Sequence, residues 1–145
     1  MLHYQIEFDD YRQHLMHVTV RFLANPTQVL SLPTWIPGSY LIREFSKHLE
    51  SVRAYDEAGR ILKIQKFEKN KWRLFNTDHE LITVEYDVYA YDLSVRGAYV
   101  DQTRLYVNPA CACLGLEGQE DKAIEVEVFL PNELKHFQLA TGLVA

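Results

Sequence analysis

The stretch Ile82-Thr83-Val84-Glu85-Tyr86-Asp87-Val88-Tyr89-Ala90-Tyr91 decides the fold of this chain. Apolar and polar residues alternate along its first nine positions, and β-branched and aromatic residues dominate. A period of two matches a β-strand that turns one face to a core and the other to water. The same alternation recurs over residues 17–22 and 124–130. We therefore predict three half-buried strands as the frame of the domain.

Shorter apolar runs predict further strands near residues 3–8, 28–32, 50–56, 61–67, 71–75, 104–107 and 137–140. Turn-forming pairs such as Asn25-Pro26 and Asn108-Pro109 separate these runs. Helical turns are expected only at Tyr40–His48 and Glu117–Asp121. Short strands between regular turns predict an all-β fold, a mostly antiparallel two-sheet β-sandwich with at most one or two short helical turns.

Length and charge restrict the classes of protein to which the chain can belong. A chain of 145 residues predicts one domain, which we place at residues 1–141. The net charge of -5 and the scattered basic residues argue against a nucleic-acid partner. No apolar run is long enough for a membrane span, and the first residues lack the pattern of a signal peptide, so we expect no membrane partner and a cytoplasmic location. Because the chain ends on apolar residues, we expect residues 142–145 to begin a truncated linker to a further part of a longer protein.

The potential metal ligands of the chain have simple explanations. Cys111 and Cys113 are two apart, so on a strand they face the same side; we interpret them as small apolar strand residues in a reducing compartment. His14 and His17 are three apart, so on a strand they face opposite sides and are interpreted as exposed polar residues. The alternating acids Glu125 and Glu127 are interpreted as solvated. No metal site is predicted within the chain.

Residues 33–46, PTWIPGSYLIREFS, are rich in aromatic, turn-forming and charged residues. Pro37 sets the first corner of a tight turn, and Gly38 can adopt the positive φ that a type II turn then requires. The turn would project Trp35 and Tyr40 on its two flanks. Two interpretations remain open: a rigid corner that closes one end of a sandwich, or a surface that docks on another domain.

Several of these motifs together resemble a known family. They are Trp35-Ile-Pro-Gly-Ser-Tyr40, Arg43–Ser46 with His48, Ala54-Tyr55-Asp56 with Gly59, Lys71-Trp72, and Tyr86–Arg96. The set resembles the N-terminal domain of the glycyl aminopeptidase-like zinc metallopeptidases, which often contain a PDZ domain. The resemblance implies structural roles for the family-motif residues Trp35, Pro37, Gly38, Ser39, Phe45 and Trp72. It also implies a parent hydrolase that removes small N-terminal residues from peptides, with zinc in a catalytic domain that follows this one.

The chain itself lacks a catalytic motif. A zinc peptidase needs His-Glu-x-x-His on a helix, whereas His79-Glu80 is followed by no second histidine at that spacing. Ser39 follows Gly38 but lacks the second glycine of a nucleophile elbow. We therefore predict that this chain has no catalytic residue and no cofactor of its own. Its expected partners are its own C-terminal catalytic domain and, through that domain, a peptide substrate.

Polar residues near aromatic ones are the candidates for a domain interface or for substrate access. They form two sets, Tyr40, Arg43 and Glu44, and then Arg96, Tyr99, Asp101, Gln102 and Arg104. Asp101 could bind a substrate ammonium group, and Gln102 could accept from one through its amide oxygen. The alternative is that ion pairs of Asp101 with Arg96 or Arg104 only fix the loop. A docking role predicts an apolar patch near Tyr40 and Tyr99.

Two other classes of function remain open. A free-standing binding module for carbohydrate or protein predicts aromatic side chains in line on one exposed sheet face. A small enzyme with a carboxylate pair predicts two close carboxylates in a pocket, one of them with a raised pKa.

Overall fold

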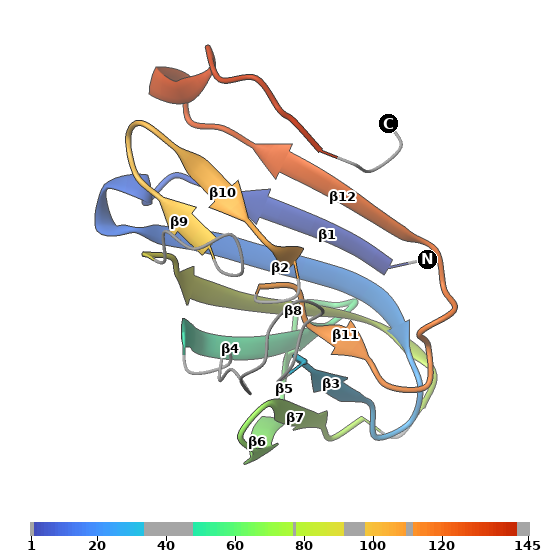
Figure 1. Cartoon of the computed structure of the whole chain (residues 1–145). Coiled ribbons are helices and arrows are strands. Elements are labelled where there is room, and N and C mark those ends of the chain that lie inside the picture. Colours follow the sequence, from blue (N-terminus) through green and yellow to red (C-terminus); the bar gives the residue numbers. More distant parts are fainter. Residues whose placement is uncertain (1, 34–47, 77, 92–97, 110–111, 142–145) are drawn as a thin grey trace.

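The computed structural model describes residues 2–33, 48–76, 78–91, 98–109 and 112–141 (Figure 1). The strands are β1 (Leu2–Glu7), β2 (Leu15–Ala24), β3 (Val29–Ser31), β4 (Leu49–Asp56), β5 (Ile61–Leu62), β6 (Ile64–Glu68), β7 (Lys71–Leu74), β8 (Glu80–Tyr89), β9 (Ala98–Val100), β10 (Leu105–Val107), β11 (Gly115–Leu116) and β12 (Ile124–Phe129). Two 3₁₀ turns accompany them, η1 (Tyr11–Gln13) and η4 (Asn132–Leu134).

The strands form two main sheets and a ribbon. One sheet has the order β12-β1-β2-β8-β4-β5, the second has the order β11-β3-β7-β6, and β9 pairs with β10 alone. The pairs are antiparallel, with the exception of β1 and β12, which run parallel. The two sheets face each other around one core (Figure 1). The predicted all-β sandwich is confirmed, and its parallel edge was not foreseen.

The centre of the large sheet is the pair β2–β8, which forms because both strands alternate over their full length. The ten residues of each strand pair in register, from Leu15 opposite Tyr89 to Ala24 opposite Glu80. Their apolar side chains line the inner face, where Val18, Val20, Val84 and Tyr86 are fully buried. Burial of one such side chain contributes about 1.5–3 kcal/mol. The alternation in the sequence thus predicted both the strands and their buried face.

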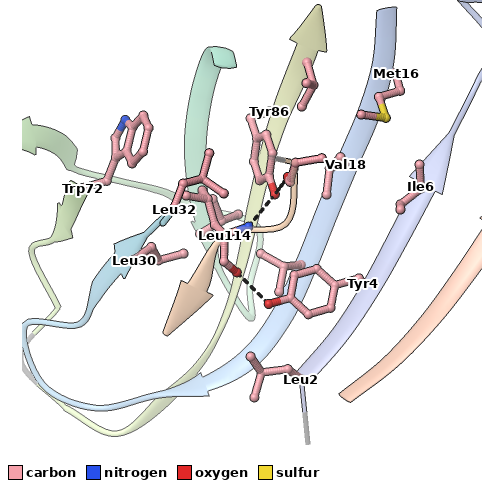
Figure 2. Close-up of a cluster of buried hydrophobic side chains, with 14 of the residues drawn as sticks. Leu2, Tyr4, Ile6, Met16, Val18, Leu30, Leu32, Trp72, Tyr86 and Leu114 are labelled. Carbon is pink, nitrogen blue, oxygen red and sulfur yellow. Dashed lines mark hydrogen bonds between the residues drawn. The ribbon is translucent and has the colours of Figure 1, made fainter. Parts of the chain in front are cut away.

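Two buried tyrosines connect the large sheet to the segment 112–114 (Figure 2). The Tyr86 hydroxyl donates to the carbonyl oxygen of Ala112 at 2.6 Å and accepts from the Leu114 N–H at 3.0 Å. The Tyr4 hydroxyl donates to the Leu114 carbonyl oxygen at 2.6 Å. Burial raises the pKa of both tyrosines well above the ordinary value. These bonds satisfy backbone groups that would otherwise be buried without a partner.

Three local expectations were wrong. Cys113 lies outside the strands, and its N–H donates to the carbonyl oxygen of Pro109. The neighbouring backbone groups of Ala112 and Leu114 bond to a tyrosine hydroxyl and not to a partner strand. The Cys113 thiol is not in a disulfide, and Cys111 lies outside the described residues. Residues 117–121 form turns without a helix. Residues 137–140 form no strand, because Leu139, 73% exposed, has no core to face and no described strand pairs with this segment.

No helix in the described part of the chain is long and apolar enough to cross a membrane.

Candidate functional site

One end of the β2–β8 pair gathers aromatic side chains. His14 precedes β2, while Tyr89 ends β8 and Tyr91 follows it. An isolated bridge joins Tyr91 to Tyr99 of β9, and backbone bonds from Ala90 to His14 (2.7 Å) and from Val100 to Ala90 (2.9 Å) hold the three segments together. The antiparallel pairing therefore brings side chains that are 85 positions apart in sequence to one place.

The four rings form what we call the aromatic cluster: His14, Tyr89, Tyr91 and Tyr99. Tyr91 lies at the centre, with ring centroids 4.2 Å from His14, 5.4 Å from Tyr99 and 6.4 Å from Tyr89. A ring nitrogen of His14 lies 2.7 Å from the carbonyl oxygen of Val100, which fixes the imidazole. Yet Tyr89 and Tyr91 remain 41% and 57% exposed. Preorganised, exposed tyrosines are typical of binding surfaces, because each offers an apolar ring and a polar tip.

The segment 101–104, which we call the Asp101 loop, borders the aromatic cluster. One oxygen of the Asp101 carboxylate accepts from the Tyr99 hydroxyl at 2.6 Å. The other accepts from the N–H and the hydroxyl of Thr103 and from the Arg104 N–H, at 2.7 to 2.9 Å. These bonds, the Tyr99 hydroxyl first, hold the pKa of the Asp101 carboxyl well below its usual range. The hydrogen bond to Asp101 in turn raises the pKa of Tyr99.

The Asp101 carboxylate already accepts four hydrogen bonds, three from its own loop at one oxygen and one from Tyr99 at the other. The geometry thus favours a loop-fixing role for Asp101 over the binding of a substrate ammonium group. Its arginine contact is to the backbone N–H of Arg104 and not to the guanidinium that the sequence suggested. The side chains of Gln102 and Arg104 are exposed beside it.

The other predicted positions divide into two groups. Trp72 is buried on β7, with the Lys66 ammonium 5.0 Å from the centre of its ring. The remaining interface candidates and family-motif residues lie outside the described residues; they are Tyr40, Arg43, Glu44, Arg96, Trp35, Pro37, Gly38, Ser39 and Phe45.

Sequence reasoning missed three members of the aromatic cluster: His14, Tyr89 and Tyr91. A signal was present for the tyrosines, since the period of β8 assigns Tyr89 and Tyr91 to its outward face, where aromatic rings are unusual. No such signal existed for His14. It adopts a left-handed φ of 60° at the end of η1 instead of lying on a strand.

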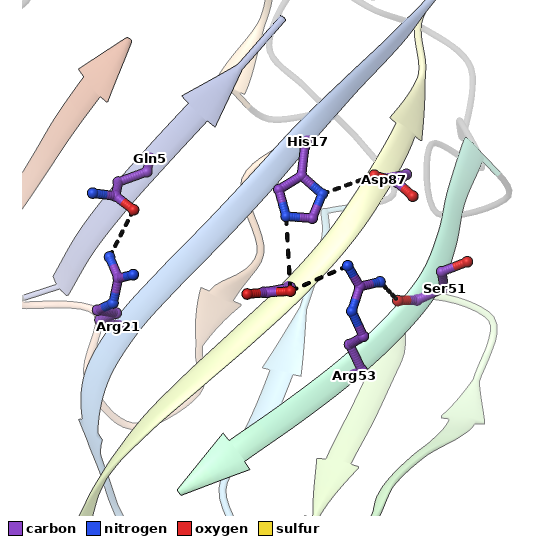
Figure 3. A network of polar contacts seen from close by, with 7 residues as sticks. Gln5, His17, Arg21, Ser51, Arg53 and Asp87 are labelled. Atoms are coloured by element: carbon purple, nitrogen blue, oxygen red, sulfur yellow. Dashed lines mark hydrogen bonds and ion pairs between the residues drawn. The ribbon is translucent and has the colours of Figure 1, made fainter. Parts of the chain in front are cut away.

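His17 also differs from the exposed residue that was expected. It is half-buried on the outer face of the large sheet, with one ring nitrogen 2.8 Å from an Asp87 oxygen and the other 3.8 Å from a Glu85 oxygen (Figure 3). The Arg53 guanidinium pairs with Glu85 at 3.1 Å and donates to the Ser51 carbonyl oxygen. Arg53 therefore supplies a positive charge beside the two carboxylates that flank His17.

The opposite end of β2–β8 carries what we call the amide cluster: Gln28, Asn76 and Gln119, all buried. The Gln28 side chain donates to the carbonyl oxygens of Val29 and Glu117 and accepts from Gln119 at 2.9 Å. Asn76 accepts from the Gln28 N–H and donates to two backbone carbonyl oxygens. Every buried side-chain nitrogen and oxygen in the described residues has a hydrogen-bond partner. This end is closed by polar bonds.

The described carboxylates do not form the acid–base pair that a small hydrolase would need. An open groove of about 280 Å³ lies between β1, β11 and β12 and includes Glu117 and Glu120. Lys71 pairs with Glu117 at 2.9 Å, and Glu120 accepts from the Gly118 N–H. The shifted carboxyl pKa values in the described residues, those of Asp56, Asp101 and Glu133, are all lowered. A general acid would need a raised one.

Comparisons with known proteins agree with this architecture. The profile of the peptidase M61 N-terminal domain matches residues 3–145. A crystal structure of an aminopeptidase N family protein from Idiomarina loihiensis is similar, with 42% identity and a TM-score of 0.87 over 92% of this chain. The match spans only 23% of that protein's chain. No curated protein matches. The described strands, the family motifs and the 143 matched positions together show that the chain belongs to the peptidase M61 N-terminal domain family.

Proposed function

We propose that this domain is a non-catalytic part of a zinc-dependent aminopeptidase and packs on the catalytic domain through the aromatic cluster. The exposed rings of that cluster are the observation that carries the proposal. Tyrosine is favoured at domain and protein interfaces because its ring buries a large area at low cost in conformational entropy. The described carboxylates offer no competing catalytic arrangement, and the family match agrees with a role beside a peptidase.

A second part of the proposal concerns substrate access. A wall beside an active-site cleft narrows entry to chain ends and excludes water. The Asp101 loop suits such a wall because its hydrogen bonds fix the backbone while the Gln102 and Arg104 side chains remain exposed. In this proposal the zinc ion lies in the catalytic domain. A PDZ domain is a further part of the same longer protein. The aromatic cluster only positions this wall.

The test uses the longer protein that contains both domains. Replacement of Tyr89 and Tyr91 together by serine should loosen docking, because two apolar rings are lost from the interface. We expect faster proteolysis between the domains and at least a tenfold lower kcat/KM on a glycine-initiated peptide, a loss of about 1.4 kcal/mol. Bound zinc should be unchanged.

A matched control lies at the other end of the same strands. Leu23 and Leu81 are 53% and 51% exposed, close to the values for the two tyrosines. Their double serine variant should keep both interdomain protection and kcat/KM. Equal effects of the two double variants, or none from the tyrosine variant, would exclude the aromatic cluster as the docking surface.

The exposed tyrosines also leave the binding-module alternative open, since aromatic rings stack on sugars as well. Tight binding of an oligosaccharide by the 145-residue chain alone, abolished by the tyrosine variant, would favour that alternative. Binding of this chain to a separately produced catalytic domain would favour docking.

A further inference from the structure

The parallel pair β1–β12 places an imidazole between two carboxylates on the outer face of the large sheet. His3 lies directly opposite Glu125, and the next outward residue of β12 is Glu127. His3 Nε2 is 2.7 Å from a Glu127 oxygen, and Nδ1 is 3.7 Å from a Glu125 oxygen. One donor atom from each residue can be chosen so that all three lie within 4.8 Å of one another.

No basic side chain in the described residues pairs with the two glutamates beside His3. Within the described residues, neither Glu125 nor Glu127 has a lysine or arginine partner within 4 Å. Arg21 lies opposite His3 on β2, but its guanidinium donates to Gln5 at 2.7 Å. The similar group around His17 differs because Arg53 neutralises Glu85. Two neighbouring carboxylates with only an imidazole between them favour a bound cation.

The donor set identifies the kind of cation. One imidazole nitrogen with two carboxylate oxygens suits Zn²⁺, which takes such ligands at about 2.0–2.2 Å and in tetrahedral geometry places them about 3.3 Å apart. Glu127 now contacts Nε2 at a hydrogen-bond distance of 2.7 Å and would move outward to admit the ion. Glu125 now lies near Nδ1, and its half-exposed side chain would rotate to reach an ion held at Nε2. Water completes the coordination.

We propose that His3, Glu125 and Glu127 bind one Zn²⁺ ion that fastens β12 to β1. The need for such a link follows from the packing of β12. It is an edge strand of the described sheet, and of its inward residues only Val126 packs against the core, while Ile124 and Val128 are 56% and 37% exposed. An ion shared with β1 would add to this limited apolar burial. The site does not depend on the docking proposal or on the zinc of a catalytic domain.

The test titrates Zn²⁺ into the 145-residue chain, produced without a histidine tag, by calorimetry and thermal unfolding. We expect one ion per chain and a rise in Tm of about 5–10 °C at a hundredfold excess over Kd. Hydrogen exchange of the β12 amides should slow when Zn²⁺ is present. The combined variant Glu125→Gln and Glu127→Gln should lose all three responses while retaining His3, which excludes binding to a lone surface imidazole.

The matched control is His17→Gln, which removes the other imidazole bracketed by two acids and should keep the full zinc response. Arg21→Gln removes a neighbouring positive charge and should tighten binding several-fold. The proposal is overturned if the wild-type chain shows neither bound zinc nor a Tm shift, or if the carboxamide variant responds equally. Zinc binding without slower exchange in β12 would refute its role in fastening the strand. Folding of each variant is checked by its circular dichroism, and the exposed carboxamide replacements conserve shape.

Discussion

The two ends of the β2–β8 pair use opposite chemistry. At one end, three buried amides of the amide cluster hydrogen-bond the loops around Asn25, Val29 and Glu117. At the other, the aromatic cluster leaves two tyrosine rings about half exposed. A buried amide without its partners costs far more than an exposed ring without its neighbour. The difference indicates that one end maintains the fold, while the other is available for recognition.

The largest effect is expected from Gln28→Ala at the amide end. The change leaves the Asn25 N–H, a Gln119 side-chain N–H and two carbonyl oxygens short of a partner. We expect a loss of about 3 kcal/mol in the free energy of unfolding, measured by urea denaturation. Gln102→Ala, an exposed glutamine at the aromatic end, is the control and should change stability by less than about 0.5 kcal/mol. Equal losses would erase the contrast between the ends.

An intermediate effect, which depends on pH, is expected from Asp101→Asn. Hydrogen bonds to the ionised carboxylate depress its pKa in the folded state. Its stabilising contribution is therefore complete above the unfolded value of about 4 and is lost as pH falls through the folded value. The Tm difference between wild type and variant should be constant near neutral pH and should shrink on acidification below about pH 4. A difference that does not change with pH would disprove the assigned hydrogen bonds.

The smallest effect on stability is expected from Tyr91→Ser. The ring is 57% exposed and its contacts are to other partly exposed rings, so unfolding should change by no more than about 1 kcal/mol. Chemical denaturation of this chain measures the effect. A loss as large as that of Gln28→Ala would mean that the aromatic cluster is part of the core, and the assignment of recognition to that end would fail.

Local sequence patterns predicted most of the long strands of this fold but few of the contacts between distant side chains. Period-two alternation located β2, β8 and β12 because burial of one face is recorded in consecutive residues. The same reasoning failed at residues 137–140, where alternation occurs without a partner strand. It also gave no sign that β12 would lie parallel to β1, because a strand's pattern does not encode the direction of its neighbour.

The candidate site was predictable only where neighbouring residues in the sequence form it. The Asp101 loop could be located because Asp101, Gln102 and Arg104 lie close together before the turn signal Asn108-Pro109. The bond from the Tyr99 hydroxyl was missed because sequence does not reveal side-chain orientation. The contact of His14 with Val100 joins residues 86 positions apart and depends on the assembled sheet.

The position of β1 between β12 and β2 has a consequence for biosynthesis. During synthesis β1 gains one neighbour soon, from β2, but its other edge stays open until residues 124–129 have been made. Pairings so distant in the chain slow folding and leave a strand edge exposed in the meantime. A nascent chain of this domain therefore passes through a period in which β1 can pair with other polypeptides, and chaperone capture should be strongest in that interval.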